Sequence, residues 1–210
     1  MFNDNVQGTG AVVMAAVYSG LKVAGTAMAE QTLVVFGSGT AGVGIAGQLR
    51  DAMIASTQRP MIFPISNLTE KIEAMPADVL DWSGGKALVA TGIPVDPVEY
   101  DGITYEIGQA NNFLVFPGLG LGVTASRAQR VTKGMLEAAA TAVAREADVS
   151  TPGAALLPNV RNLRALSAVV AEAVYATAHT DGVATKKPAD VVQAIVDTMW
   201  QPCYDGGPGK

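Results

Sequence analysis

A glycine-rich segment follows a short apolar stretch and has the spacing of a phosphate-binding turn. Residues 33–36 run directly into Gly37, Gly39 and Gly42, which fit the pattern G-x-G-x-x-G. In such a turn the first glycine makes the sharp bend, the second lets the backbone approach a pyrophosphate, and the third lets helix and strand pack closely. The helix N-terminus that follows favours negative charge. The pattern predicts a dinucleotide site; a purely structural glycine turn is the alternative.

A second group of polar side chains lies in the middle of the chain. Asn111 and Asn112 precede the apolar run 113–116 and could bind an amide or a carboxylate of a ligand. Asparagines at such positions more often cap a turn, and their spacing alone favours that use. His179, the single histidine, follows a predicted helix, where we expect a structural position at the helix end.

The elements that would position these residues alternate between short apolar strands and helices. Strands are predicted at 32–36, 61–65 and 87–91, and an Asp-Gly pair within 98–105 predicts a hairpin. A helix from Thr9 to about Val23 should end at Gly25, and others should cover 41–54 and begin at 76. Apolar residues with a period near 3.6 predict three helices towards the C-terminus, over 132–148, 162–178 and 189–200.

Composition excludes several classes of protein. With 14 basic residues and a net charge of -5, the chain has no basic cluster to hold a nucleic-acid backbone. One cysteine excludes an internal disulfide framework, and a single histidine with no zinc-ligand spacing excludes a zinc finger, so a reducing cytoplasm is the expected compartment. The apolar run 10–18 follows no positive segment and is too short to span a bilayer, so we expect a buried helix and no membrane partner.

One expected feature of a dinucleotide site is missing from the second predicted strand. In NAD-binding units this strand normally ends in Asp or Glu, which binds the ribose hydroxyls. Here the strand ends in Ser66 and Asn67, and Glu70 and Glu73 are placed beyond the strand tip. Either the ribose is held in another way, or this strand is not the second strand of the usual unit.

Several ordered motifs together resemble the C-terminal NAD-binding domain of malic enzymes. They are the N-terminal FNDNVQGT, the glycine turn, FPISNLT at 63–69, ALVATG at 87–92, GQANN at 108–112 and FPGLGLG at 116–122. The resemblance runs from Phe2 to about Tyr204. It implies an α/β fold, a Rossmann-type three-layer parallel sheet, here shortened, with flanking C-terminal helices. It also implies a domain over 1–204 and a flexible tail over 205–210.

The resemblance implies a function and residues that serve it. Malic enzymes oxidise L-malate with NAD or NADP and decarboxylate the product to pyruvate with the help of Mg²⁺ or Mn²⁺. Asp4 and Asn5 match the acidic pair of the family, whose second member is usually a metal ligand. Asn67 and Asn111 match asparagines that contact the substrate and nicotinamide. The cofactor-binding turn comprises Gly37, Ser38, Gly39, Thr40, Ala41 and Gly42.

The chain also departs from the family pattern. Asn5 replaces an aspartate, which removes one negative charge from a site for a hard cation. Residues 54–60 join the first phosphate-binding helix directly to a late strand, so that on the order of a hundred residues, including the ribose-binding strand, are missing. The N-terminal substrate domain, which supplies the family's Tyr and Lys acid/base pair, is not in this sequence. We therefore assign no catalytic residue.

Three hypotheses remain from the sequence. The first is a malic-enzyme-type oxidoreductase domain, expected to be inactive as an isolated chain. The second is a non-catalytic relic or regulatory subunit that binds a nucleotide or associates with other chains. The third, a generic dinucleotide-binding protein, fits the ordered asparagine motifs less well. A shortened sheet exposes an edge, so a homo-oligomer is expected in each case.

Overall fold

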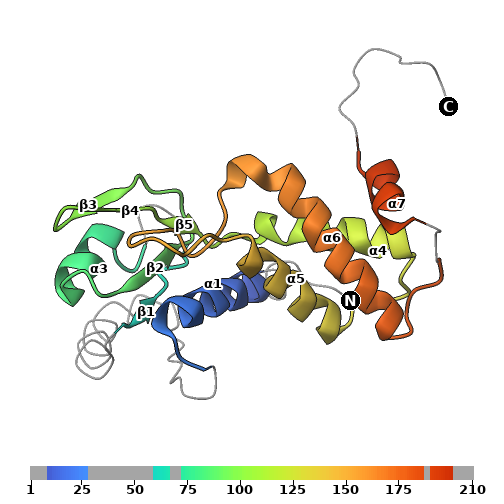
Figure 1. The fold of residues 1–210 in the computed structure, drawn as a ribbon, viewed down its shortest axis with the longest axis horizontal. Helices are drawn as coiled ribbons and strands as arrows, with labels where there is room; N and C mark the ends of the chain where they lie inside the picture. Colours follow the sequence, from blue (N-terminus) through green and yellow to red (C-terminus); the bar gives the residue numbers. More distant parts are fainter. Residues whose placement is uncertain (1–8, 28–58, 67–71, 187–189, 201–210) are drawn as a thin grey trace, which may run out of the picture.

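The computed structural model describes residues 9–27, 59–66, 72–186 and 190–200. A small α/β unit lies at one end of the molecule and a group of packed helices at the other, with helices α1 (Thr9–Ala24) and α5 (Lys133–Arg145) between them (Figure 1). The chain passes from the sheet to the helices after residue 109. None of the described helices is both long and apolar enough to cross a membrane.

The described sheet has three parallel strands in the order β1-β2-β5. These are β1 (Met61–Ile62), β2 (Leu88–Thr91) and β5 (Gly108–Gln109). Met61 pairs with Leu88, and Ala90 pairs with Gly108. All four residues of β2 are buried, as expected for a central strand of a parallel sheet. The buried strand predicted at 87–91 is confirmed, whereas the strand predicted at 61–65 is shorter, with two residues.

Helices cover both faces of this sheet. Val89 packs in a cluster with Val79 of helix α3 (Pro76–Ser83), whereas Ala90 belongs to the main core together with Val12 of α1. Successive side chains of a strand point to opposite faces, so α3 and α1 lie on opposite sides. The arrangement is a mixed α/β fold with a small parallel sheet, as the sequence predicts for a shortened Rossmann-type domain.

Local signals in the sequence predict where several elements begin and end. Helix α1 ends at Gly25, which has a φ of +65° and donates from its N–H to the Leu21 carbonyl at 2.9 Å. Strands β3 (Val98–Tyr100) and β4 (Ile103–Tyr105) form the predicted antiparallel hairpin. Asp101 and Gly102, with φ of +50° and +75°, make the turn, as an Asp-Gly pair favours.

The predicted C-terminal helices are confirmed. Thr132 caps α5 by accepting a hydrogen bond from the Met135 N–H at 3.1 Å. Asp190 caps α7 (Val191–Thr198) by accepting one from the Gln193 N–H at 3.0 Å. Between them lies α6 (Leu163–Thr180), the longest described helix, which follows the short 3₁₀ segment η5 (Val160–Asn162).

One helix, α4 (Phe116–Ser126), is not predicted by the sequence. Glycine is a poor helix former, and α4 contains three glycines, so its pattern indicates no helix. Two of them face α6. A Cβ on Gly118 would lie 2.5 Å from the Val170 Cβ, and one on Gly122 would lie 2.7 Å from the Ala171 carbonyl oxygen. Close packing of α4 on α6 therefore needs glycine at both positions, and this tertiary contact outweighs the poor local propensity.

Candidate functional site

The carboxyl ends of the three parallel strands meet at one edge of the sheet. The chain leaves β1 towards Ser66, leaves β2 at Gly92 and leaves β5 towards Asn111. Because parallel strands run in one direction, these three exits lie side by side. In open α/β sheets ligands bind outside this carboxyl edge. We refer to Ser66, Gly92 and Asn111, with the turns that carry them, as the carboxyl-edge site.

Backbone contacts hold the turns of the carboxyl-edge site together. The Gly92 N–H donates to the Pro64 carbonyl at 2.9 Å, and the Ala110 N–H donates to the Thr91 carbonyl at 2.6 Å. The side chain of Gln109 donates from Nε2 to the Gly92 carbonyl at 3.0 Å. A Cβ on Gly92 would lie 2.4 Å from the carbonyl oxygen of Ile65, so only glycine allows this approach. The turns after β1 and β2 are thus in direct contact.

The carboxylate of Glu73 reaches back to the turn after β1. The Ser66 hydroxyl donates to Oε1 at 2.6 Å, and the Ser66 N–H donates to Oε2 at 3.3 Å. The sequence places Glu73 beyond the strand tip, which is correct for its backbone, but the side chain returns to the tip. No local sequence pattern signals a contact between these two residues, which are seven positions apart. Glu73 therefore fixes the residue that directly precedes Asn67.

Asn111 occupies the turn that follows β5. Its Oδ1 accepts a hydrogen bond from the Phe113 N–H at 3.3 Å and so caps the short 3₁₀ helix η4 (Asn112–Leu114). The capping use that the spacing favours is confirmed. The side chain is half-buried at the carboxyl edge, in the turn where the resemblance places a ligand-binding asparagine. A cap and a ligand contact are compatible, because Asn has two polar atoms on its side chain.

The other residues that the sequence assigns to a site lie outside the described residues. Of the assigned set, the structure describes Asn111 alone. Those outside are the proposed metal ligands Asp4 and Asn5, the glycine turn Gly37, Ser38, Gly39, Thr40, Ala41 and Gly42, and the asparagine Asn67.

Metal chemistry has no support from the described part of the chain. Among those residues, no group of three or more His, Cys, Asp or Glu side chains is arranged to hold a metal ion. The assigned ligands Asp4 and Asn5 lie outside these residues, so we derive no step through a metal.

His179 has a structural role at the end of α6. Its Nε2 lies 3.0 Å from the carbonyl oxygen of Lys186, and its ring lies 4.7 Å from the ring of Tyr175. The Tyr175 hydroxyl donates to the same carbonyl at 3.2 Å, and burial raises the pKa of Tyr175 above its usual value. Both side chains thus contact the segment that follows α6 through the Lys186 carbonyl. A structural position of this kind is what we expect for a histidine at a helix end.

Comparison with protein families gives a match in two segments. The family described as "Malic enzyme, NAD binding domain" matches residues 6–57 and 51–179. The two matched segments overlap at residues 51–57. This overlap includes part of the junction at 54–60, where the sequence predicts missing βα units. The break in the match therefore coincides with the predicted internal deletion.

Individual relatives agree with this family. The chain is 45% identical to a protein of Mycobacterium tuberculosis named as a malate oxidoreductase (NAD), over 98% of this chain and 53% of the relative. It is 36% identical to NAD-dependent malic enzyme 3 of Bacillus subtilis, over 97% of this chain and 51% of the relative. The chain thus spans about half the length of these curated relatives. The first alignment covers 289 residues, more than the 210 residues of this chain, so the relative contains an internal segment that is absent here.

Solved structures support the fold. The crystal structure of the malic enzyme from Entamoeba histolytica matches with a TM-score of 0.69 at 18% identity, over 94% of this chain and 52% of the other. At this identity the likeness shows the fold alone. Together with the family match, these observations identify the chain as a member of the malic enzyme NAD-binding domain family, in a form that lacks an internal segment after the glycine-rich turn.

Proposed function

We propose that this domain binds NAD or NADP at the carboxyl-edge site and belongs to a malic-enzyme-type oxidoreductase that converts L-malate to pyruvate. One observation carries the proposal: the turns after β1, β2 and β5 converge at the edge of the sheet where open α/β domains bind their ligands. The names of the relatives, a malate oxidoreductase and an NAD-dependent malic enzyme, indicate the substrate and the cofactor.

The proposal assigns roles to residues of this chain. The turn Gly37–Gly42 holds the pyrophosphate through its backbone N–H groups. Asn67 and Asn111 orient the nicotinamide and the substrate, because neutral amides donate to a carboxylate or carboxamide without adding charge. Asp4 and Asn5 stand where the family binds its metal. The domain that carries these roles extends over 1–204, with a tail at 205–210.

We expect no turnover from the 210-residue chain by itself. The Tyr and Lys acid/base pair that the resemblance requires has no match in it: Lys86, Lys133, Tyr100 and Tyr105 lie outside the motifs of that pair. The family match breaks at residues 51–57, and the segment that is missing there would include the strand whose acidic residue binds the ribose. The chain therefore lacks the residue that usually distinguishes NAD from NADP.

A second candidate function follows from the same missing segment. A chain that retains the glycine turn but lacks the ribose-binding strand fits a non-catalytic subunit that binds a nucleotide or assembles with other chains. Asn5 in place of an aspartate also favours this reading, because it weakens a site for a hard cation.

Two measurements test these proposals. Purified chain incubated with L-malate, Mn²⁺ and NAD or NADP should form no pyruvate, and measurable pyruvate would contradict inactivity of the isolated chain. Separately, NAD at a hundred times its Kd should add about 2.7 kcal/mol to the free energy of unfolding. The control is Gly39→Val, which blocks the approach of a pyrophosphate to the turn. No stabilisation by NAD, NADP or ADP-ribose would exclude the cofactor role in both candidate functions.

A further inference from the structure

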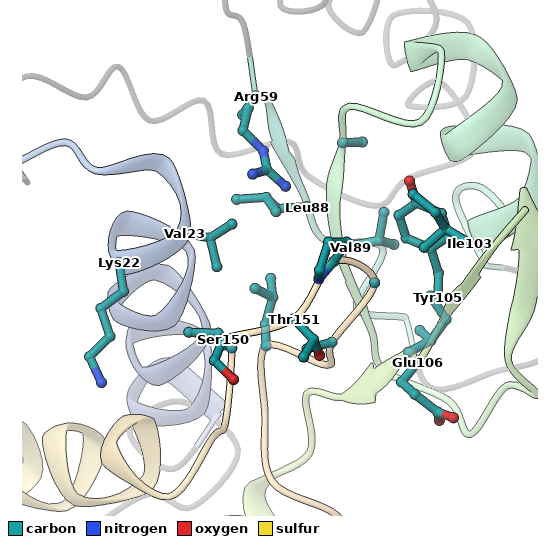
Figure 2. Close-up of a pocket in the computed structure, with 17 residues that line it drawn as sticks. Lys22, Val23, Arg59, Leu88, Val89, Ile103, Tyr105, Glu106, Ser150 and Thr151 are labelled. Atoms are coloured by element: carbon teal, nitrogen blue, oxygen red, sulfur yellow. The ribbon is translucent and has the colours of Figure 1, made fainter. Parts of the chain in front are cut away.

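A cavity of about 440 Å³ lies at the opposite end of the strands from the carboxyl-edge site (Figure 2). Its walls come from the last turns of α1, the start of β2, the end of the β3–β4 hairpin and the loop 149–156. Leu88, which lines it, is the first residue of β2, whereas the carboxyl-edge site begins after Thr91. The two sites are therefore separate, and the cavity is outside the nucleotide-binding function proposed above. We refer to it as the amino-end cavity.

The floor of the amino-end cavity is apolar. Leu88 of the sheet, which is buried, and Val23 of α1 line it. In Figure 2 these two side chains lie between the helix and the strand, below Arg59. A surface of this kind favours the apolar part of a small molecule, and the volume lies in the range of small-molecule sites in proteins.

A positive charge is directed into this apolar setting. Figure 2 shows the guanidinium of Arg59 pointing towards Leu88, with Lys22 at the edge of the cavity and its ammonium on the outer side. Within the described part of the chain, neither side chain makes an ion pair. The carboxylate that lines the cavity, Glu106, lies on the far side of the view from Arg59. A guanidinium that makes no ion pair among the described residues, beside an apolar floor, favours a carboxylate or phosphate, to which Arg can donate two parallel hydrogen bonds.

The wall opposite α1 is held in place before any ligand binds. The Gly153 carbonyl accepts a hydrogen bond from the Glu106 N–H at 2.8 Å. Gly153 has a φ of +79°, and a Cβ on it would lie 2.2 Å from the Thr104 carbonyl oxygen, so the loop lies directly against the hairpin. The Asp148 carboxylate accepts from the Ser150 N–H at 3.1 Å and fixes the start of the same loop. A fixed wall reduces the conformational entropy that a ligand must remove on binding.

We propose that the amino-end cavity binds a small organic anion with an apolar body. Its carboxylate or phosphate pairs with the Arg59 guanidinium, its apolar part covers Leu88 and Val23, and the hydroxyls of Ser150 and Thr151 line the opposite wall. Neither half of the site suffices alone, because one exposed arginine binds anions weakly and the apolar floor does not select for charge.

A methyl NMR titration of the full chain tests the proposal with octanoate as the probe. Octanoate should shift the methyl signals of Val23 and Leu88, and Arg59→Gln should weaken its apparent affinity by at least tenfold. Arg161→Gln is the matched control, because Arg161 is also exposed but lies outside the cavity. Thr151→Trp, at an exposed position of the wall, narrows the cavity and should also weaken binding.

Two neutral or small probes separate the contributions of charge and apolar surface. Octanol should shift the same methyl groups much less than octanoate, and inorganic phosphate should bind more weakly than octyl phosphate. Equal binding of octanoate by the wild-type chain and Arg59→Gln, or equal shifts with octanol, would overturn the proposal. Displacement of octanoate by NAD would also overturn it, by assigning the anion to the carboxyl-edge site. If NAD does not bind, the comparison of octanoate binding by the wild-type chain and Arg59→Gln is unaffected. The proposal for the amino-end cavity and the proposal for the carboxyl-edge site can therefore fail separately.

Discussion

The carboxylate of Glu73 accepts hydrogen bonds from both the hydroxyl and the backbone N–H of Ser66, at 2.6 and 3.3 Å. This contact joins the turn after β1 to the segment that precedes α3. Ser66 directly precedes Asn67, the asparagine to which the proposed function gives a ligand contact. The geometry of the carboxyl-edge site therefore depends on a residue that lies outside all the motifs of the sequence.

Glu73→Ala should destabilise the domain by about 1–3 kcal/mol, because it leaves two half-buried donors of Ser66 without their charged acceptor. Glu73→Gln retains one acceptor oxygen, and we expect a smaller loss. Urea denaturation measures both, with Glu172→Ala on the exposed face of α6 as the control. A loss from Glu73→Ala no larger than that from the control would show that the contact does not stabilise the domain.

The three glycines of α4 should differ in their response to alanine. Gly118→Ala and Gly122→Ala place a Cβ against Val170 and Ala171, and should cost roughly 1–3 kcal/mol through overpacking. Gly120 has no atom within 4 Å of a built Cβ. Gly120→Ala should therefore be neutral or stabilising by up to about 1 kcal/mol, through helix propensity. Thermal unfolding of the three variants checks the order, and equal effects at all three positions would contradict the close contact of α4 with α6.

Asn111 allows capping to be separated from ligand binding. Asn111→Ala should cost about 1 kcal/mol, because the Phe113 N–H loses its acceptor. Asn111→Ser retains a capping oxygen but removes the amide, so its stability should stay near that of the wild-type chain. If Asn111 contacts the nicotinamide as proposed, NAD should stabilise both variants less than the wild-type chain. An unchanged response of Asn111→Ser to NAD would assign the side chain to the cap alone.

Stability should fall at alkaline pH through two tyrosines, the buried Tyr175 and the half-buried Tyr18. Burial raises the pKa of Tyr175 and of Tyr18, the latter with a further contribution from the nearby carboxylate of Glu137. The neutral phenols are favoured in the folded state. This stabilisation is fully present below the unfolded pKa of about 10 and is lost as the pH rises through the raised folded values.

Phenylalanine at position 175 tests this pH dependence. Tyr175→Phe should lose about 1 kcal/mol at neutral pH with the hydrogen bond to the Lys186 carbonyl, and its stability should fall less steeply above pH 10 or so. Guanidinium denaturation at neutral pH and above about pH 10 gives the comparison. The double variant with Tyr18→Phe should show a still smaller fall in stability at alkaline pH. Identical alkaline losses in the wild-type chain and Tyr175→Phe would contradict the assignment.

The sequence by itself predicts those elements that local chemistry specifies. The hairpin follows from Asp101 and Gly102, because these residues tolerate the positive φ that its turn requires. The end of α1 at Gly25 and the buried strand β2 follow from the same kind of local rule. Ordered motifs also predict the family and the junction near residues 54–60, which the two-segment match confirms.

Only the tertiary structure shows the features that depend on residues distant in sequence. Helix α4 contradicts its local propensity, because Gly118 and Gly122 are required by contact with α6. The return of Glu73 to Ser66 and the amino-end cavity around Arg59 depend on how separate loops meet. Such contacts have no periodicity along the chain, since they are set by the packing of whole elements. The local sequence thus determined the hairpin, the end of α1, the strand β2 and the family, and the packing of whole elements determined the shape of both candidate sites.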